Sequence, residues 1–143
     1  CNDTVFFRGD GLRRGKIGVG PKRSRGLAGS YDPAGKVLTF VSYKVKEAPF
    51  GYVNSAWQIQ DEPYAGDVIN AYNDGPSEQG GSPLGPFYEL ETSSPAAALE
   101  PNETMKHVQQ TWHMKGSDEQ LKALAHKLFG ADLTEIEKGF LVK

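Results

Sequence analysis

Short runs of apolar and β-branched residues, bounded by glycine and proline, recur along most of this chain. Such runs are typical of β-strands, because branched and aromatic side chains suit a pleated surface. The clearest is KVLTFVSYKV at residues 36–45, where apolar residues occupy both faces of the strand. The pattern predicts about seven strands in all. The others are expected at residues 4–7, 16–20, 52–60, 67–72, 86–93 and 104–114, with a tight turn at residues 29–36.

Residues 117–143 follow a helical period instead. Ser117 and Gln120 have the spacing of a capping box, and Gly130 is placed to end the helix. Asp132 is placed to cap one further short turn. The apolar stripe of the helix consists of Leu121, Leu124, Ala125 and Leu128. The 143 residues therefore predict a single, mostly β domain closed by a helical C-terminal tail.

Two glutamates occupy alternate positions of the strand expected at residues 86–93. Because strand side chains alternate between two faces, Phe87, Glu89 and Glu91 should share one face. A solvated edge strand explains this pattern, and so does a strand that carries a catalytic base into a cleft. The strand at residues 104–114 alternates in the same way, with His107, Gln109, Thr111 and His113 on one face and Val108, Trp112 and Met114 on the other.

A second polar stretch, residues 60–75, combines tyrosines with amides and carboxylates. This combination suits a sugar, because a pyranose ring offers an apolar C–H face and a ring of hydroxyls. Turn chemistry explains the Asn-Asp-Gly sequence equally well. With the preceding tryptophan, the candidate sugar-binding residues are Trp57, Asp67, Asn70, Tyr72, Asn73 and Asp74.

The net charge of −2 hides an uneven distribution. Residues 1–25 hold seven Lys or Arg and two Asp (+5), and the remainder holds nine basic and sixteen acidic residues (−7). The basic piece would bind an anion, or it would form a solvated loop that pairs with the acidic remainder. No aromatic residue lies between positions 8 and 30, so stacking on nucleic-acid bases is not expected. The cluster consists of Arg13, Arg14, Lys16, Lys22, Arg23 and Arg25.

Several classes of function lack support. Cys1 is the only cysteine, which excludes an internal disulfide, and no G-x-S-x-G motif of a serine hydrolase is present. His107 and His113 would lie about 20 Å apart along one strand, too far to share a metal ion. The GKIGVG sequence at residues 15–20 is followed by no helical pattern, so we expect no dinucleotide cofactor. No run of about 18 apolar residues predicts a membrane span.

Longer strings of the sequence resemble a known superfamily. ELETSSPAAALEPNE followed by MKHVQQTWHM resembles the last strands of galactose-mutarotase-like proteins, which include the aldose 1-epimerases. On this match Glu91-Thr92 occupies the position of the family glutamate, and LEPNE at residues 99–103 is the turn that follows. Asn102 stands where glycine is usual, and asparagine tolerates the positive φ that glycine allows. FRGDG, KIG, GSYD, LTF, YVNS-W, GDV-N-YNDGP and FYELE-SSPA also resemble, in this order, uncharacterised bacterial members.

The resemblance spans residues 5–116 and implies an antiparallel β-sandwich, part of a β-supersandwich. In the epimerases a glutamate deprotonates the anomeric hydroxyl while a histidine donates a proton to the ring oxygen, which makes Glu91 the implied base. Glu89 would disfavour ionisation of its neighbour through like-charge proximity, or it would hold a sugar hydroxyl. The family histidines lie upstream of the glutamate, whereas the three histidines here all follow Glu91.

The chain therefore resembles the C-terminal half of such a protein. Either a missing N-terminal half or a second copy would complete its sheets, since an isolated half leaves open sheet edges. The absent initiator methionine fits a piece of a longer chain, and a leading cysteine is also the form of a processed lipoprotein. A bacterial location in cytoplasm or periplasm stays open.

We expect a carbohydrate-interacting protein or fragment that, if it is an enzyme, interconverts sugar anomers with Glu91 as base. The first alternative is a non-catalytic carbohydrate-binding or structural module of a larger sugar-processing protein. The second alternative is an anion-binding protein that uses the basic cluster between residues 13 and 25.

Overall fold

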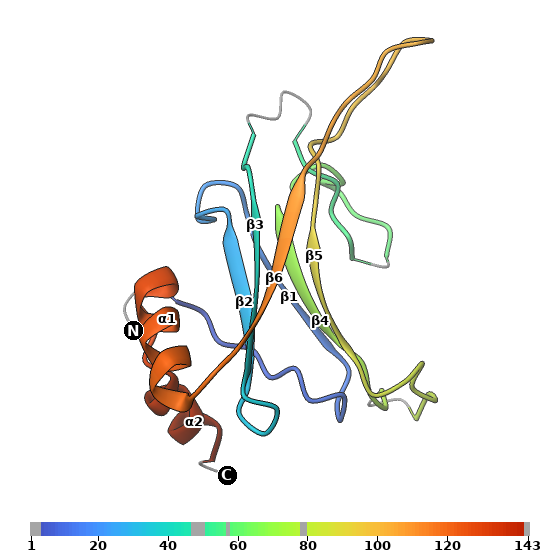
Figure 1. The fold of residues 1–143 in the computed structure, drawn as a ribbon. Coiled ribbons are helices and arrows are strands. Elements are labelled where there is room, and N and C mark those ends of the chain that lie inside the picture. Colours follow the sequence, from blue (N-terminus) through green and yellow to red (C-terminus); the bar gives the residue numbers. More distant parts are fainter. Residues whose placement is uncertain (1–3, 47–50, 57, 78–79, 142–143) are drawn as a thin grey trace.

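The computed structural model describes residues 4–46, 51–56, 58–77 and 80–141. Within these residues, six strands are followed by two helices (Figure 1). The strands are β1 (Gly15–Val19), β2 (Leu27–Asp32), β3 (Val37–Tyr43), β4 (Ile69–Asn73), β5 (Tyr88–Thr92) and β6 (Gln109–Lys115). The helices are α1 (Asp118–Phe129) and α2 (Leu133–Leu141).

The strands form two antiparallel sheets of three strands each. In one sheet β4 lies between β1 and β5, and in the other β3 lies between β2 and β6. Figure 1 shows the two sheets one in front of the other, with both helices beside the β2–β3–β6 sheet. This arrangement confirms the expected mostly β, antiparallel sandwich with a C-terminal helix.

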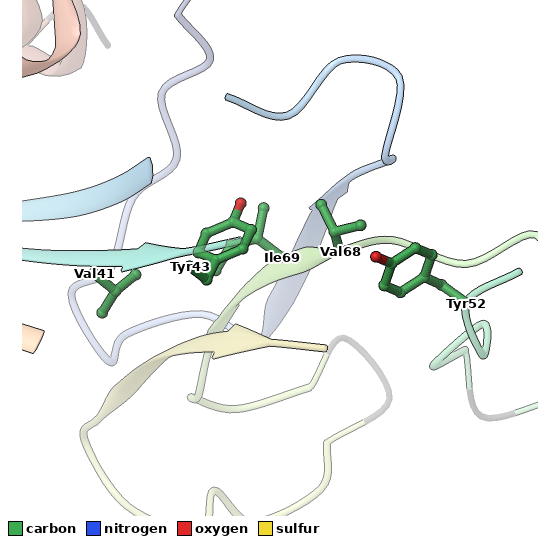
Figure 2. Close-up of a cluster of buried hydrophobic side chains, with 5 residues drawn as sticks. All are labelled: Val41, Tyr43, Tyr52, Val68 and Ile69. Atoms are coloured by element: carbon green, nitrogen blue, oxygen red, sulfur yellow. The ribbon is translucent and has the colours of Figure 1, made fainter. Parts of the chain in front are cut away.

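The first core cluster lies between the two sheets. Val41 and Tyr43 of β3 pack in the same cluster as Ile69 of β4 (Figure 2). Val68 and Tyr52 complete it, each at most 2% exposed. The Tyr52 hydroxyl donates a hydrogen bond to the Lys46 carbonyl at 2.9 Å, so the buried ring keeps a partner for its polar end.

The second cluster lies on the opposite face of β3. Leu38 packs there against Leu121 and Ala125 of α1 and Leu133 at the start of α2. Strand β3 is therefore covered on both faces, as the apolar residues on both faces of segment 36–45 predicted. This double burial explains why it is the central strand of its sheet.

The residues that the sequence predicts to begin and end the helix do so in the structure. The Ser117 side chain caps the Gln120 N–H while the Gln120 side chain accepts from the Ser117 N–H, which is the predicted capping box. Gly130 ends α1 with φ +64°, in the left-handed region. Asp132 accepts a hydrogen bond from the Thr134 N–H at 2.8 Å. The segment that it starts is a nine-residue helix, longer than the single turn expected.

Three strand predictions were wrong or too long. Residues 4–7 are not a strand, and residues 52–60 contribute, in their described part, a single bridge from Tyr52 to Ala65. The strand expected at residues 104–114 begins only at Gln109. In each case an apolar run had the composition of a strand but found no neighbouring strand to pair with, and a strand exists only through such pairing.

Strand β2 overlaps the turn that the sequence predicts at residues 29–36, and the sequence pattern did not predict this strand. The turn expected at residues 29–36 starts at Asp32, whose carboxylate accepts hydrogen bonds from the N–H groups of Ala34 and Gly35. Lys36 closes it with φ +53°. The preceding residues Leu27–Asp32 pair with β3 along their whole length.

An extended arm, which we define as residues 97–106, projects from the body (Figure 1). Every residue of the arm is exposed. At its tip the Glu103 N–H donates to the Glu100 carbonyl at 3.0 Å, and Asn102 has φ +71°. The positive φ predicted for Asn102 is thus confirmed. Among the described residues, no helix has the length and apolar character that crossing a membrane requires.

We predict that Leu121→Ala lowers the free energy of unfolding by about 2–5 kcal/mol, because it removes a side chain that joins α1 to β3 and leaves a cavity. Leu121 is 2% exposed, whereas Leu84 is 77% exposed. The matched control Leu84→Ala should change stability by less than about 0.5 kcal/mol. Urea unfolding followed by circular dichroism measures both, and equal effects would contradict the placement of α1 on the sheet.

Candidate functional site

One face of the β1–β4–β5 sheet brings together residues from the two polar stretches of the sequence. Glu91 of β5 stands opposite Asn70 of β4, and Glu89 stands opposite Tyr72. Lys16 of β1 stands opposite Tyr72 from the other side. Because paired residues share a face of the sheet, these five side chains form one surface. We call this surface, made of Lys16, Asn70, Tyr72, Glu89 and Glu91, the polar face.

The alternate residues of the same strands face the core. Val19, Ile69 and Leu90 pack in or against the cluster between the sheets. The alternation predicted for residues 86–93, with Glu89 and Glu91 on one face and Leu90 on the other, is therefore confirmed by the register. Burial of the apolar residues fixes which way the glutamates point.

Two carboxyl groups and an ammonium group lie together on the polar face. The Lys16 Nζ lies 2.7 Å from Glu91 Oε2, and both side chains are about one-third exposed. A hydrogen bond to Glu91 raises the pKa of Glu89, and burial and the charge of Glu91 act in the same direction. The ammonium of Lys16 opposes this rise. The pair thus combines one carboxyl that favours its protonated form with one that is held in an ion pair.

Asp74 continues the polar face beyond the end of β4 and is fully buried. The Tyr72 hydroxyl donates to Asp74 Oδ1 at 2.7 Å, and the Gly85 N–H donates to Oδ2 at 2.8 Å. Arg14 approaches the same carboxylate at 3.6 Å. The hydrogen bond from Tyr72 is the main reason that the pKa of Asp74 falls to about 2, although burial opposes the shift. Asp74 is a fixed anion that orients the Tyr72 ring.

A glycine makes room for two further polar side chains. Gly18 stands opposite Asn70 in the sheet. A Cβ at this position would overlap the Asp67 carboxylate and would lie 2.7 Å from Asn70 Oδ1. Burial raises the pKa of Asp67, which precedes β4. Asp67 and Asn70 therefore lie above β1 only because residue 18 has no side chain.

Two of the sequence candidates do not join this surface. Asn73 lies on the opposite face of β4, and its amide donates to Asp10 Oδ1 at 3.1 Å and to the Arg13 carbonyl at 2.9 Å. It also accepts from the Gly11 N–H at 2.8 Å, so its groups anchor the segment before β1. Trp57 lies outside the described residues.

Lys16 and Gly18 are the members of the site that sequence reasoning missed. In the sequence Lys16 belongs to the basic cluster, and Gly18 belongs to the glycine-rich segment at residues 15–20. Their spacing of two places them on one face of a strand, which was a usable signal. What the sequence does not give is that this strand pairs with β4, about fifty residues away.

The basic cluster is partly neutralised by the acids of the same chain. Arg14 pairs with Asp74 and donates to the Ser82 carbonyl at 3.4 Å, and Lys16 pairs with Glu91. These contacts follow the interpretation in which the basic piece pairs with the acidic remainder of the chain. Arg14 and Lys16 thus belong to the site around the polar face.

The histidines lie elsewhere. His107 Nε2 lies 2.9 Å from the Thr92 hydroxyl, and Thr92 points to the opposite face from Glu91. His113 bonds to the Thr39 hydroxyl at 2.9 Å on the other sheet, and His126 is exposed on α1. No group of three potential metal ligands occurs in the described part of the chain. The polar face therefore offers carboxyl, amide, phenol and ammonium groups for its chemistry.

We predict that Asp74→Asn lowers stability at neutral pH and flattens its acid dependence. The pKa of Asp74 in the folded chain, about 2, lies below its ordinary value of 3.8. Its contribution to stability is therefore present above about pH 4 and lost as the pH falls toward 2. Urea midpoints at pH 7, 4, 3 and 2.5 measure the effect. Asp61→Asn, at an exposed position, is the control and should leave the pH profile unchanged.

Residues 1–140 match the model of a family of unknown function (DUF6786). No curated protein matches the chain, and no solved structure does. The match covers nearly the whole chain, including every residue of the polar face.

Proposed function

Since this chain belongs to DUF6786, a family of unknown function, we propose a function from its polar face: it binds carbohydrate there and interconverts sugar anomers with Glu91 as the base. The resemblance of residues 5–116 to galactose-mutarotase-like proteins supports the same function. The proposal assigns sugar contacts to Glu89, Asp67, Asn70 and Tyr72.

The observation that carries the proposal is the position of Glu91. It stands opposite Asn70 on a sheet face rich in hydrogen-bonding groups, and Lys16 holds it at 2.7 Å. Sugar hydroxyls both donate and accept, and the amide, phenol and carboxyl groups here supply both functions. The Tyr72 and Phe87 rings, with centroids 6.1 Å apart, offer apolar surface for the C–H face of a pyranose.

The chemistry requires little more than proton transfer. An ionised carboxylate removes the proton of the anomeric hydroxyl, and the bond between the anomeric carbon and the ring oxygen breaks as the ring oxygen takes up a proton. The ring then recloses on the other face of the carbonyl, and both protons are returned. The ammonium of Lys16 lies 2.7 Å from Glu91 Oε2 and forms an ion pair with it. A carboxylate that is ionised at neutral pH is the form that a base requires.

One observation favours a second candidate, a non-catalytic carbohydrate-binding or structural module of a larger sugar-processing protein. The three histidines all lie away from the polar face, so the imidazole acid of the epimerases has no counterpart there.

We also propose that a second copy or an N-terminal half completes the two sheets. Their edge strands in the described residues are β1 and β5 in one sheet and β2 and β6 in the other.

We predict that the chain accelerates anomer interconversion of glucose or galactose and that Glu91→Gln reduces this acceleration at least about 10²-fold, the usual contribution of a general base. Two-dimensional exchange NMR measures the rate. Glu62→Gln, at an exposed position outside the polar face, is the matched control and should keep full activity. Sugar binding without acceleration would reject the enzyme and support the non-catalytic module.

A steric test addresses binding separately from catalysis. We predict that Gly18→Ala weakens sugar binding roughly tenfold or more, because the new methyl group displaces two hydrogen-bonding side chains, Asp67 and Asn70. Gly20→Ala is the control, since its Cβ would lie 3.6 Å from Asp67 Oδ1, an ordinary contact. Titration calorimetry with the two variants measures the difference, and equal affinities would place the sugar elsewhere.

A further inference from the structure

We infer that Glu89 is the proton donor of the polar face, the acid that works beside Glu91 as base. The inference rests on the proposed function, because it names the second catalytic group of the same reaction. It replaces the expected histidine with a carboxyl group from the same strand.

The geometry of β5 places the two carboxyl groups side by side. Glu89 and Glu91 are alternate residues of one strand, so both point to the polar face, opposite Tyr72 and Asn70 respectively. Side chains two residues apart on one face of a strand lie close enough to interact, and the interaction with Glu91 raises the pKa of Glu89. Neighbouring carboxylates disfavour each other's charge, so one of the two groups holds its proton more strongly.

The surroundings decide which carboxyl keeps that proton. Lys16 of β1 contacts Glu91 at 2.7 Å, which stabilises negative charge on Glu91. The anion of Asp74, just after the end of β4, also disfavours charge on Glu89. Arg14 is engaged with Asp74. The charges of Glu91 and Asp74 act together to raise the pKa of Glu89, so Glu89 is the carboxyl that we assign as the proton carrier.

Other donors on the polar face are already engaged. The Tyr72 hydroxyl donates to Asp74 at 2.7 Å, and Lys16 is held in the ion pair with Glu91. Asn70 has an amide, which does not transfer protons near neutral pH. Among the polar-face residues, Glu89 is thus the group that has both a transferable proton and a base beside it.

The two neighbouring carboxyl groups match the positions of the two sugar oxygens that exchange protons in the reaction. The two oxygens that exchange protons, the anomeric hydroxyl and the ring oxygen, are bonded to the same carbon, so acid and base must also be neighbours. Glu91 takes the hydroxyl proton, the carbon–ring oxygen bond breaks as the carbonyl forms, and Glu89 gives its proton to the ring oxygen. Ring closure on the other carbonyl face returns both protons, so no net proton is gained or lost.

The rate profile of the chain tests this role. In the native chain the rate should fall at high pH, as Glu89 loses its proton. We predict that Glu89→Gln reduces the rate at least about 10²-fold and removes the fall at high pH. The control Glu62→Gln should keep the fall at high pH. An unchanged rate and profile in Glu89→Gln would overturn the role of Glu89 while leaving Glu91 and the proposed function intact.

A second readout does not depend on sugar turnover. Carboxyl carbon shifts of ¹³C-labelled glutamate, followed against pH, report which side chain holds the proton. The ¹³C signal should show that the Glu89 carboxyl ionises at higher pH in the native chain than in Glu91→Gln, where the neighbouring charge is absent. Ionisation of Glu89 at the same pH in both chains would overturn the influence of Glu91 on Glu89. Absence of any acceleration by the native chain would overturn the proposed function and the catalytic role of Glu89 together, whatever the titration shows.

Discussion

The pairing register of β4 between β1 and β5 is the constraint on which the rest of the molecule depends. Side chains of a strand alternate strictly, so a slip of one residue would turn Ile69 toward solvent and Asn70 toward the core. Burial of Ile69 against Tyr43 excludes that slip. The same hydrophobic contact that holds the two sheets together therefore also aims the carboxyl and phenol groups outward. The core and the site lie on opposite faces of the same strand, so a shift in its pairing register would disrupt both.

The carboxyl groups on and beside the polar face differ in their ionisation because their surroundings differ, although they are the same chemical group. Three carboxyl groups lie close together, yet Asp74 is a buried anion fixed by donors, Glu91 is held by an ammonium group, and the pKa of Glu89 is raised by its interaction with Glu91. Such separation of the ionisation behaviour of neighbouring acids is how one surface can both accept and donate protons at a single pH. The cations that pair with two of these carboxylates, Arg14 and Lys16, come from the basic first part of the chain.

The sequence predicted what depends on neighbours along the chain and missed what depends on distant pairing. The helix caps at Ser117 and Gly130, the positive φ of Asn102 and the alternation around Glu91 follow from a few adjacent residues, and each was predicted correctly. Residues 4–7 and 52–60 have strand composition without a strand partner, and their failure shows that composition alone does not make a strand. The approach of Lys16 to Glu91 spans about half of the chain, and no local pattern contains it.

The order of strands in the two sheets has a consequence for how the chain can be divided. Each sheet contains a local hairpin, β4–β5 in one and β2–β3 in the other, and each is completed by a strand from the far side of the sequence. β1 crosses from the first segment to join β4, and β6 crosses from the last segment to join β3. A cut between β3 and β4 would therefore leave each piece with a strand that belongs to the sheet of the other. The two sheets are interlocked through the backbone, so the domain must assemble as one unit, with its longest loops closed before either sheet is complete.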